Sequence, residues 1–535
     1  MAIDAPAPPT DSAPAITRND TWLHLFFGLL LVASAVTFTL WSIGWMGDGA
    51  SRSVLIVAIV FGLFMAFNIG GNDVANSFGT SVGAGTLTMK QALLIAAVFE
   101  LAGAVLAGGR VTETVRSGIV DLDALAGDAT HLAFVMMAAL LGAGIWLMLA
   151  TRFGLPVSTT HAIIGGIVGA AVTMGIATGA GGPGMVQWGG IGTIAISWVV
   201  SPLCGGLLAF AIYWIIKRRI LGYNERADEA IEALRTERDA HRTKHEARRG
   251  RLTEMQQESY RLSMEQDAAL VRKGTYDPAA LSTEYYRELH EISAKEREVR
   301  PHRALELWGP ILAGGGAMII AGMLVLKGLG NLDLPIGVAA QVAIVVVIGV
   351  AAWLIVRVFT TKLRAQTLPR ATFVLFAWMQ VFTASAFAFS HGSNDISNAV
   401  GPFAAVLDTL RDGAVTAQGA VPTPVMVAFG IAMLSGLWFI GRRVITTVGE
   451  KLTKIHPASG FAAELAAAAV VMLATFSGLP VSSTHTLIGA ILGIGLVNRT
   501  ANWQLMKPIG LAWIVTLPAT ALMGAVGYVA ISAIF

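Results

Sequence analysis

The polar sequence Asn-Asp-x-x-Asn occurs twice, at 72–76 and at 394–398, each time at the end of a long apolar run. A carboxylate at membrane depth is costly unless it binds a partner, and such residues mark ion or substrate pathways. Carboxylate, amide and carbonyl oxygens suit Na⁺, and a carboxylate also takes a proton. The two copies therefore predict a cation or proton site built from these residues: Asn72, Asp73, Asn76, Asn394, Asp395 and Asn398.

A second sequence, Gly-Leu-Pro-Val-Ser-x-Thr-His, also occurs twice, at 154–161 and 478–485. Glycine and proline end a membrane helix, and serine and threonine after them are typical of a new helix N-terminus. Such an end offers free N–H groups, hydroxyl donors and the positive end of the helix dipole, which suit an anion. The hydroxyls could also do no more than cap their helices. We expect anion contacts from Ser158, Thr159, Thr160, Ser482, Ser483 and Thr484.

Both sequences appear in the same order and at nearly the same separation in the two halves of the chain, which indicates an internal repeat. Glycine and asparagine at 68–72 and 390–394 predict that the helices are broken there, because non-helical backbone at membrane depth is tolerated around a polar cavity. An anion and a cation bound side by side lower each other's desolvation cost. The paired sites therefore favour symport.

Composition places these residues in a membrane. Hydrophobic residues make up 55% of the 535 residues and charged residues only 13%, which excludes a water-soluble globular protein of this size. The single cysteine, Cys204, excludes an internal disulfide and argues against a cysteine-rich metal site. No Gly-x-x-x-x-Gly-Lys sequence occurs, so we expect an ion gradient rather than ATP as the driving force, and no cofactor.

Apolar runs of spanning length recur along almost the whole chain and predict an all-α polytopic membrane protein with about 12 spans. We expect a disordered N-terminal tail at 1–21, a first transmembrane half at 22–216, a charged helical insert at 217–305 and a second transmembrane half at 306–535. The insert carries acids and bases interleaved, so one or two solvated helices with a break at 274–278 are expected. Its acids nearly match its bases, which argues against nucleic-acid binding.

Basic residues at a span end mark the cytoplasmic side of the membrane. They follow the spans that end near 217–219 and 362–370, so the insert is expected in the cytoplasm. The loop at 47–50 has a single arginine beside it. If that loop is external, the two copies of the repeat enter from opposite faces. The pattern predicts an inverted-topology repeat bundle with broken helices or helical hairpins at the midplane.

The motifs resemble those of the PiT family of inorganic phosphate transporters. The resemblance rests on Gly-Asn-Asp-Val-Ala-Asn-Ser-Phe-Gly-Thr-Ser-Val-Gly at 71–83, Ser-Asn-Asp-Ile-Ser-Asn at 393–398 and both Pro-Val-Ser-x-Thr-His segments. It implies a bacterial inner-membrane symporter that moves phosphate with H⁺ or Na⁺ by alternating access. Family members similar to this chain favour H⁺ and accept metal–phosphate complexes. The phosphate-binding positions map onto Asp73, Asn76, Ser158, Thr159, Thr160, Asp395, Asn398, Ser482, Ser483 and Thr484.

Two acids and three histidines lie near these motifs. Glu100 and Glu464 lie inside apolar runs, where a carboxyl either bonds to a neighbouring helix or relays protons, and we expect a role in coupling-ion contact. His161 and His485 follow the hydroxyl clusters and could either relay a proton or pack. His391 has no repeat partner, because Ile69 occupies the equivalent position, and a structural role is expected.

Other functions remain open at this point. A passive anion channel would conduct without coupling and would leave the buried carboxylates without a task. An intramembrane hydrolase could use Asp73 and Asp395 as a dyad, or Ser158 and His161 as nucleophile and base, but neither needs a duplicated hydroxyl cluster. The expected partners are phosphate, the coupling cation and the bilayer, and a homo-oligomer is compatible with the sequence.

Overall fold

The computed structural model describes residues 21–46, 51–121, 129–325, 337–412, 421–441, 444–445, 456–501 and 503–535. These residues are almost entirely helical, and the only β-pairing among them is an isolated bridge between Val120 and Val186. Twelve of the described helices are long and apolar enough to cross a membrane. The predicted class of all-α polytopic membrane protein is confirmed, whereas the predicted tail at 1–21 lies outside the described residues except for Thr21.

Two compact units make up the chain: one comprises residues within Met1–Trp214, Ala313–Ala352 and Phe373–Phe535, and the other Ile215–Leu312 and Trp353–Thr372. The first half of the chain supplies seven helices to the larger unit: α1 (Thr21–Met46), α2 (Arg52–Gly83), α3 (Met89–Ala107), α4 (Gly109–Ser117), α5 (Ala129–Arg152), α6 (Thr159–Ala177) and α7 (Trp188–Ile216). The second half supplies α13 (Leu368–Asp395), α14 (Ser397–Asp412), α15 (Thr423–Ile440), α17 (Pro457–Phe476), α18 (Ser483–Asn498) and α19 (Trp503–Ile534). Helices α11 (Arg303–Met323) and α12 (Val338–Lys362) each contribute residues to both units, as do the end of α7 and the start of α13.

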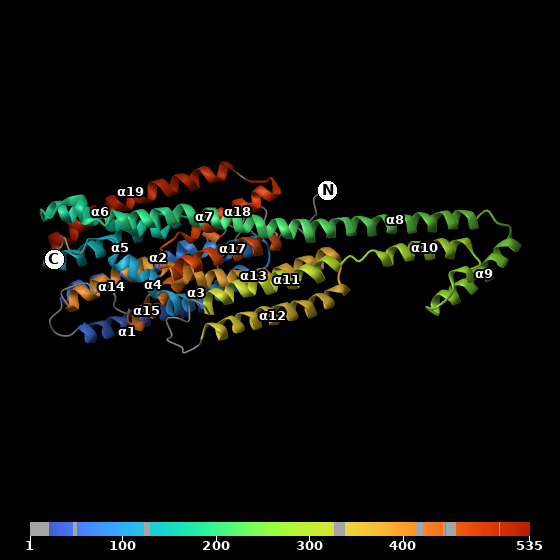
Figure 1. The fold of residues 1–535 in the computed structure, drawn as a ribbon, viewed down its shortest axis with the longest axis horizontal. Coiled ribbons are helices and arrows are strands. Elements are labelled where there is room, and N and C mark those ends of the chain that lie inside the picture. Colours follow the sequence, from blue (N-terminus) through green and yellow to red (C-terminus); the bar gives the residue numbers. More distant parts are fainter. Residues whose placement is uncertain are drawn as a thin grey trace. The chain divides into compact units, whose positions relative to one another are not determined.

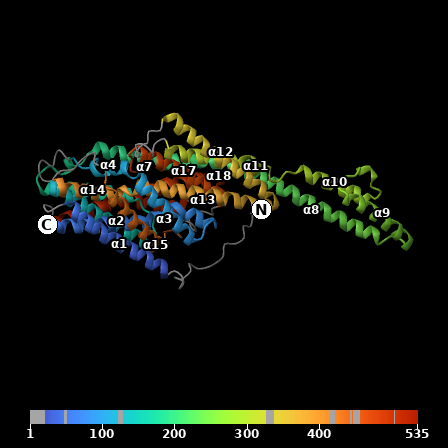
Figure 2. The ribbon, with the colours of Figure 1, turned by 90° about the horizontal axis from the view of Figure 1, so that it is seen from below.

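The smaller unit holds most of the charged insert. The sequence predicts one or two helices there, and the structure has three: α8 (Gly222–Arg249), α9 (Glu254–Arg272) and α10 (Glu284–Glu298). The additional break follows Gly250, where Thr253 begins α9 with a capping box to Gln256. Helix α10 lies along α8 (Figures 1 and 2). The ion pairs Arg238–Glu296 and Lys295–Glu237 link these two helices.

Close helix packing in the larger unit depends on glycine. Helices α2 and α15 pack together, as do α6 and α19 (Figures 1 and 2). A Cβ atom at Gly70 would lie 1.8 Å from the carbonyl oxygen of Met433, and one at Gly436 would lie 1.7 Å from that of Phe67. These two positions therefore accept only glycine without a backbone shift, in keeping with the small residues at membrane helix contacts.

The second repeated sequence folds as predicted, into a helix end followed by a new helix start. Gly154 and Gly478 adopt positive φ angles of 66° and 69°, which glycine tolerates best, and each ends its preceding helix. The Ser158 hydroxyl caps α6 by accepting from the His161 N–H at 3.1 Å. The Ser482 hydroxyl caps α18 in the same way, at 3.2 Å from the His485 nitrogen.

The predicted break in the first Asn-Asp-x-x-Asn copy is wrong. Residues 68–72 lie inside the continuous helix α2, and only the second copy is interrupted, at Ile396 between α13 and α14. The prediction assumed that the asparagine side chain would compete for its own main chain. Instead, Asn72 bonds to another segment, and the glycines serve helix packing, so the backbone stays helical.

Candidate functional site

The side chains of Asn72 and Asn394 bind the turns that join α5 to α6 and α17 to α18, which we call the hairpin turns. The Asn72 amide donates to the Thr151 hydroxyl at 2.9 Å and the Leu155 carbonyl at 3.1 Å, and its oxygen accepts from the Val157 N–H at 3.2 Å. Asn394 makes the same three bonds in the other half, to Thr475 at 3.0 Å, Leu479 at 3.2 Å and Val481 at 3.2 Å. Both side chains are therefore engaged as anchors, rather than free as the ion ligands that the sequence suggested.

Asn76 and Asn398 connect each half to the hydroxyl cluster of the other half. The Asn76 amide donates to the Thr484 hydroxyl at 2.7 Å. The Asn398 amide lies 3.3 Å from the hydroxyls of both Thr159 and Thr160. The four elements that carry the repeated motifs thus meet at one centre in the larger unit, and the structure brings together the residues that the sequence separates by more than 200 positions.

Asp73 and Asp395 lie at this centre. One Asp73 oxygen accepts from the Thr484 hydroxyl at 2.9 Å and the Asn76 amide at 3.2 Å, and one Asp395 oxygen accepts from the Ser483 hydroxyl at 2.7 Å. The other oxygens, Asp73 Oδ2 and Asp395 Oδ1, have no hydrogen-bond partner among the described residues. Buried carboxylate oxygens are normally satisfied, so these atoms are available to a proton, a cation or a ligand.

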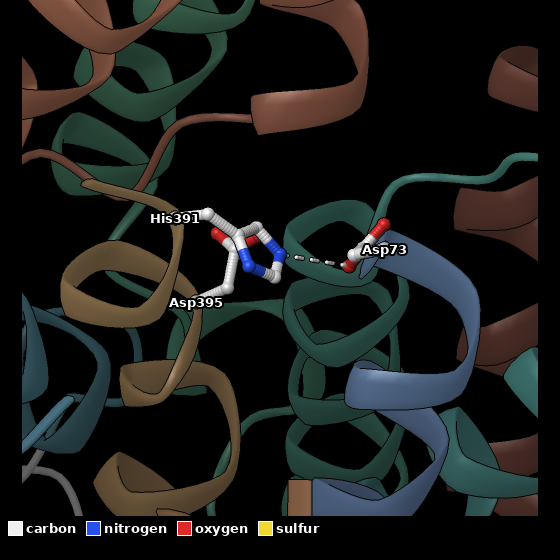
Figure 3. Close-up of side chains that lie close together, drawn as sticks. All are labelled: Asp73, His391 and Asp395. Atoms are coloured by element: carbon white, nitrogen blue, oxygen red, sulfur yellow. Dashed lines mark ion pairs between the residues drawn. The ribbon is translucent and has the colours of Figure 1, made fainter. Parts of the chain in front are cut away.

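His391, for which the sequence suggested a structural role, lies between the acids at the centre. Its Nε2 lies 2.9 Å from Asp395 Oδ2 and 4.0 Å from Asp73 Oδ2, as Figure 3 shows. Its Nδ1 lies 3.1 Å from Glu100 Oε1. The signal available in the sequence was its place four residues before Asp395, which puts both side chains on one face of a helix.

Glycine brings Glu100 to His391. A Cβ atom at Gly392 would lie 2.2 Å from the Glu100 carbonyl oxygen, and one at Gly103 would lie 2.0 Å from that of Phe389. Helices α3 and α13 therefore cross at backbone contact distance. Glu100, His391 and Asp395 form a continuous chain of groups that can each carry a proton.

The same centre could hold a small cation. Asp73, His391 and Asp395 each offer one ligand atom, and these atoms lie within 4.8 Å of one another. A cation at this place would have two carboxylate oxygens and one imidazole nitrogen as ligands. This donor set suits a divalent or transition-metal ion better than it suits Na⁺.

Glu464 forms a second polar cluster, separate from His391. It accepts hydrogen bonds from the hydroxyls of Thr80, Ser81 (2.8 Å) and Thr383 (2.9 Å) and from the Gln380 amide (3.2 Å). The side chain is fully buried. Three hydroxyl oxygens around a carboxylate are hard ligands of the kind that Na⁺ prefers, and the same donors stabilise an ionised carboxylate without a cation.

His161 and His485 contact one another, with ring centroids 4.7 Å apart. His161 also packs edge-on against Trp198 at 3.9 Å, and its ring nitrogens have no hydrogen-bond partner among the described residues. No carboxylate pairs with His161 in the described part of the chain, so the geometry favours packing over a proton relay for this residue.

Each of the ten expected phosphate-binding side chains is at most 2% exposed, so the site is closed in this structure. Hydroxyl and amide donors, two helix N-termini and unsatisfied carboxylate oxygens meet in one buried centre. This combination offers donors to an anion and acceptors to a proton or cation, as expected of a membrane transport protein.

Comparison with known proteins agrees with this class. The model of the phosphate transporter family matches residues 69–524. The chain is 56% identical over 514 residues to "Putative phosphate permease Mb2302" of Mycobacterium bovis, covering 96% of this chain and 93% of that protein. It is 32% identical over 494 residues to "Inorganic phosphate transporter 2-1, chloroplastic" of Arabidopsis thaliana, covering 90% and 73%. The chain belongs to the phosphate transporter family.

A solved structure also matches. "The sodium-dependent phosphate transporter" superposes with a TM-score of 0.70 at 28% identity, covering 90% of this chain and all of that chain. The protein is therefore a phosphate transporter of the membrane, and its relatives are permeases and transporters rather than enzymes. The hydrolase alternatives are thereby set aside.

Proposed function

We propose that the protein imports inorganic phosphate into the bacterial cytoplasm by secondary active symport, through alternating access of two inverted repeats. The observation that carries the proposal is the buried centre in which Asp73 and Asp395 keep unsatisfied oxygens beside two duplicated hydroxyl clusters. In this proposal phosphate oxygens accept hydrogen bonds from the hydroxyl and amide groups of the site. Those donors come from Asn76, Ser158, Thr159, Thr160, Asn398, Ser482, Ser483 and Thr484.

The two aspartates make coupling a physical requirement. An ionised carboxylate repels a phosphate anion at contact distance, strongly so away from water. A proton or a cation that binds to Asp73 or Asp395 removes this repulsion, and phosphate in turn favours that binding. In this proposal a bound coupling ion therefore strengthens phosphate binding beside the two aspartates.

H⁺ is the favoured coupling ion. The chain Glu100–His391–Asp395 has contact distances of 3.1 and 2.9 Å and offers a route by which a proton reaches the centre. Na⁺ is the second candidate, supported by the oxygen cluster around Glu464 and by the sodium-dependent structural relative. The ligand atoms of Asp73, His391 and Asp395 would also let a divalent cation enter with phosphate as part of the substrate.

Uptake into proteoliposomes tests the proposal. Radiolabelled phosphate uptake is measured with an imposed Na⁺ gradient, with an imposed pH gradient and with neither, at one external pH so that phosphate speciation outside stays constant. Accumulation that requires the pH gradient supports H⁺ symport, and accumulation that requires Na⁺ supports the second candidate. Removal of divalent cations by a chelator tests the metal–phosphate substrate. Uptake that ignores both gradients would favour an anion channel.

Asp73→Asn and Asp395→Asn provide the residue test. Each variant keeps the side-chain volume and removes the charge, so we expect each to abolish accumulation while membrane insertion is unchanged. Wild-type accumulation in either variant would remove that residue from the proposed site.

A further inference from the structure

A basic pocket lies at the base of the insert, in the smaller unit, and none of its lining residues belongs to the transport site. It has a volume of about 440 Å³ and is lined by Arg300, Pro301, His302, Arg303, Glu306 and Arg364. This volume is in the range of small-molecule sites. The family resemblance and the proposed transport function assign nothing to these residues.

The pocket carries positive charge that the protein does not neutralise. Glu306 is its only acid, and that carboxylate is already shared by Arg364, which binds it through two nitrogens, and by Arg357 at 3.5 Å. The guanidinium groups of Arg300 and Arg303 make no ion pair or hydrogen bond within the part of the chain that the structure describes. Two arginines at one wall of a cavity without a carboxylate partner suit a doubly charged anion.

One wall of the pocket is also preformed. His302 Nε2 lies 3.1 Å from the Gln366 carbonyl oxygen, and Arg364 is fixed by Glu306, so the start of α11 is tied to the end of α12. Helix α11 begins at Arg303, and its N-terminus adds the positive end of a helix dipole to the same wall. A rigid wall loses little conformational entropy when it binds a ligand.

The position of the pocket fits the membrane surface. It lies at the polar ends of two candidate spans, one ending at Met323 and one starting at Val338. One turn and a half along α11, Trp308 lies under Arg219 with 5.3 Å between the guanidinium carbon and the ring centroid. Tryptophan and basic residues are typical of the membrane–water interface.

We propose that this pocket binds a phosphate group, as a second anion site formed by residues other than those of the transport site. Two sources share this chemistry, the headgroup of an anionic phospholipid such as phosphatidic acid and free inorganic phosphate. Arginine forks in a fixed cavity recognise phosphate oxygens through paired N–H bonds, so both sources use the same contacts.

The test uses the full-length chain and two double variants. Arg300→Gln/Arg303→Gln removes the two unpaired guanidinium groups, and Arg272→Gln/Lys273→Gln removes the same charge from an exposed place on α9. In one arm, native mass spectrometry counts the phosphatidic acid molecules retained from a mixture with phosphatidylcholine. In the other arm, binding of radiolabelled phosphate is measured with the protein in phosphatidylcholine nanodiscs. Phosphate bound at the transport site forms a first class of binding and serves as the folding control.

We expect the pocket variant to bind phosphatidic acid or a second class of phosphate roughly 10–100-fold more weakly than wild type, and the α9 variant to match wild type. Loss in the lipid arm identifies a headgroup as the ligand, and loss in the phosphate arm identifies free phosphate. If the pocket variant matches wild type in both arms, or if both variants lose binding equally, the proposal is overturned. Because the first class of phosphate binding reports the transport site, this outcome is distinct from failure of the proposed function.

Discussion

The two halves of the transmembrane unit share their centre and differ beside it. Ile69 lies four positions before Asp73, and His391 lies four positions before Asp395, so Ile69 and His391 are equivalent positions of the repeat. Where Gly392 packs on the Glu100 carbonyl, Gly70 packs on the Met433 carbonyl. The pair Glu100–His391 in one half therefore corresponds to the apolar pair Met433–Ile69 in the other half.

The Glu464 cluster is equally one-sided. Leu140 lies as far before Ser158 as Glu464 lies before Ser482, so Leu140 is the counterpart of Glu464. The positions equivalent to the glutamate and its four partners hold only apolar residues or proline: Ala58, Phe61, Leu140, Pro402 and Phe403. Phosphate needs donors from both sides, which a duplicated motif supplies. A coupling ion needs one charged route, so we infer that it reaches Asp73 and Asp395 through the residues that the repeat does not duplicate.

The largest effect is expected when the asymmetric pair is converted to its counterpart. Glu100→Met/His391→Ile copies the residues of the other half into this position. Because the variant removes two groups that can carry a proton, we expect gradient-driven phosphate accumulation to fall by about two orders of magnitude or more. The measurement is initial uptake into proteoliposomes, and Met433→Leu, at the equivalent contact in the other half, should stay close to wild type. Wild-type accumulation in the double variant would show that coupling does not depend on the pair Glu100–His391.

Glu464 is the next test of the asymmetry. Glu464→Leu copies the counterpart Leu140 and leaves three hydroxyls and an amide without their acceptor, at roughly 1–3 kcal/mol for each group that stays unsatisfied. We expect lower thermal stability and at least roughly 10-fold slower uptake. Glu464→Gln keeps the shape and removes only the charge, so thermal unfolding beside uptake separates packing from ion binding. If the Gln variant transports like wild type under every gradient, Glu464 contacts no coupling ion.

Substitutions of the anchors Asn72 and Asn394 should have the same effect in both halves, unlike those of Glu100 and Glu464. Asn72→Ala and Asn394→Ala each remove three hydrogen bonds of nearly the same lengths. We expect each variant to lower the free energy of unfolding by roughly 1–3 kcal/mol for each buried group left unsatisfied, with no change in which gradient drives uptake. Thermal unfolding and gradient dependence are measured together. A changed coupling ion in either variant would return that residue to the ion site.

The smallest effect is expected outside the repeats. Burial acts to raise the pKa of Asp267 in the insert, but hydrogen bonds from Thr283 and Ser282 outweigh it and lower the pKa below its ordinary value. The bonds therefore stabilise the α9–α10 connection above the ordinary aspartate pKa of about 3.9, and this contribution is lost as pH falls through the lower folded value. Asp267→Asn should speed hydrogen exchange at 281–287 by an amount that shrinks with acidification, and leave uptake unchanged. An equal effect at every pH would show that the charge plays no part.

The sequence was sufficient to predict the spans, from the length of the apolar runs, and the helix ends at Gly154 and Gly478, from a local pattern that occurs twice. His391 could not be assigned in this way, because it has no partner in the repeat. Its role depends on Glu100, which lies 291 positions away and is brought near by two glycine contacts between α3 and α13.

The anchors show a second limit of local patterns. Asparagine beside glycine predicts a broken helix when only the neighbouring main chain is considered. In the structure the Asn72 amide bonds to the hairpin turn instead, and α2 continues without a break. The hydrogen-bond partner of a polar side chain at membrane depth is thus set by the tertiary structure, and the local sequence around that side chain does not reveal it.

The most direct test of the central claim compares phosphate exchange with phosphate accumulation in Glu100→Gln. Exchange across proteoliposomes without a gradient needs only the shared centre, whereas accumulation needs the coupling route. The account predicts near wild-type exchange in Glu100→Gln together with the loss of gradient-driven accumulation. Wild-type accumulation, or loss of exchange in a correctly folded variant, would contradict the division between a shared phosphate centre and a one-sided coupling route.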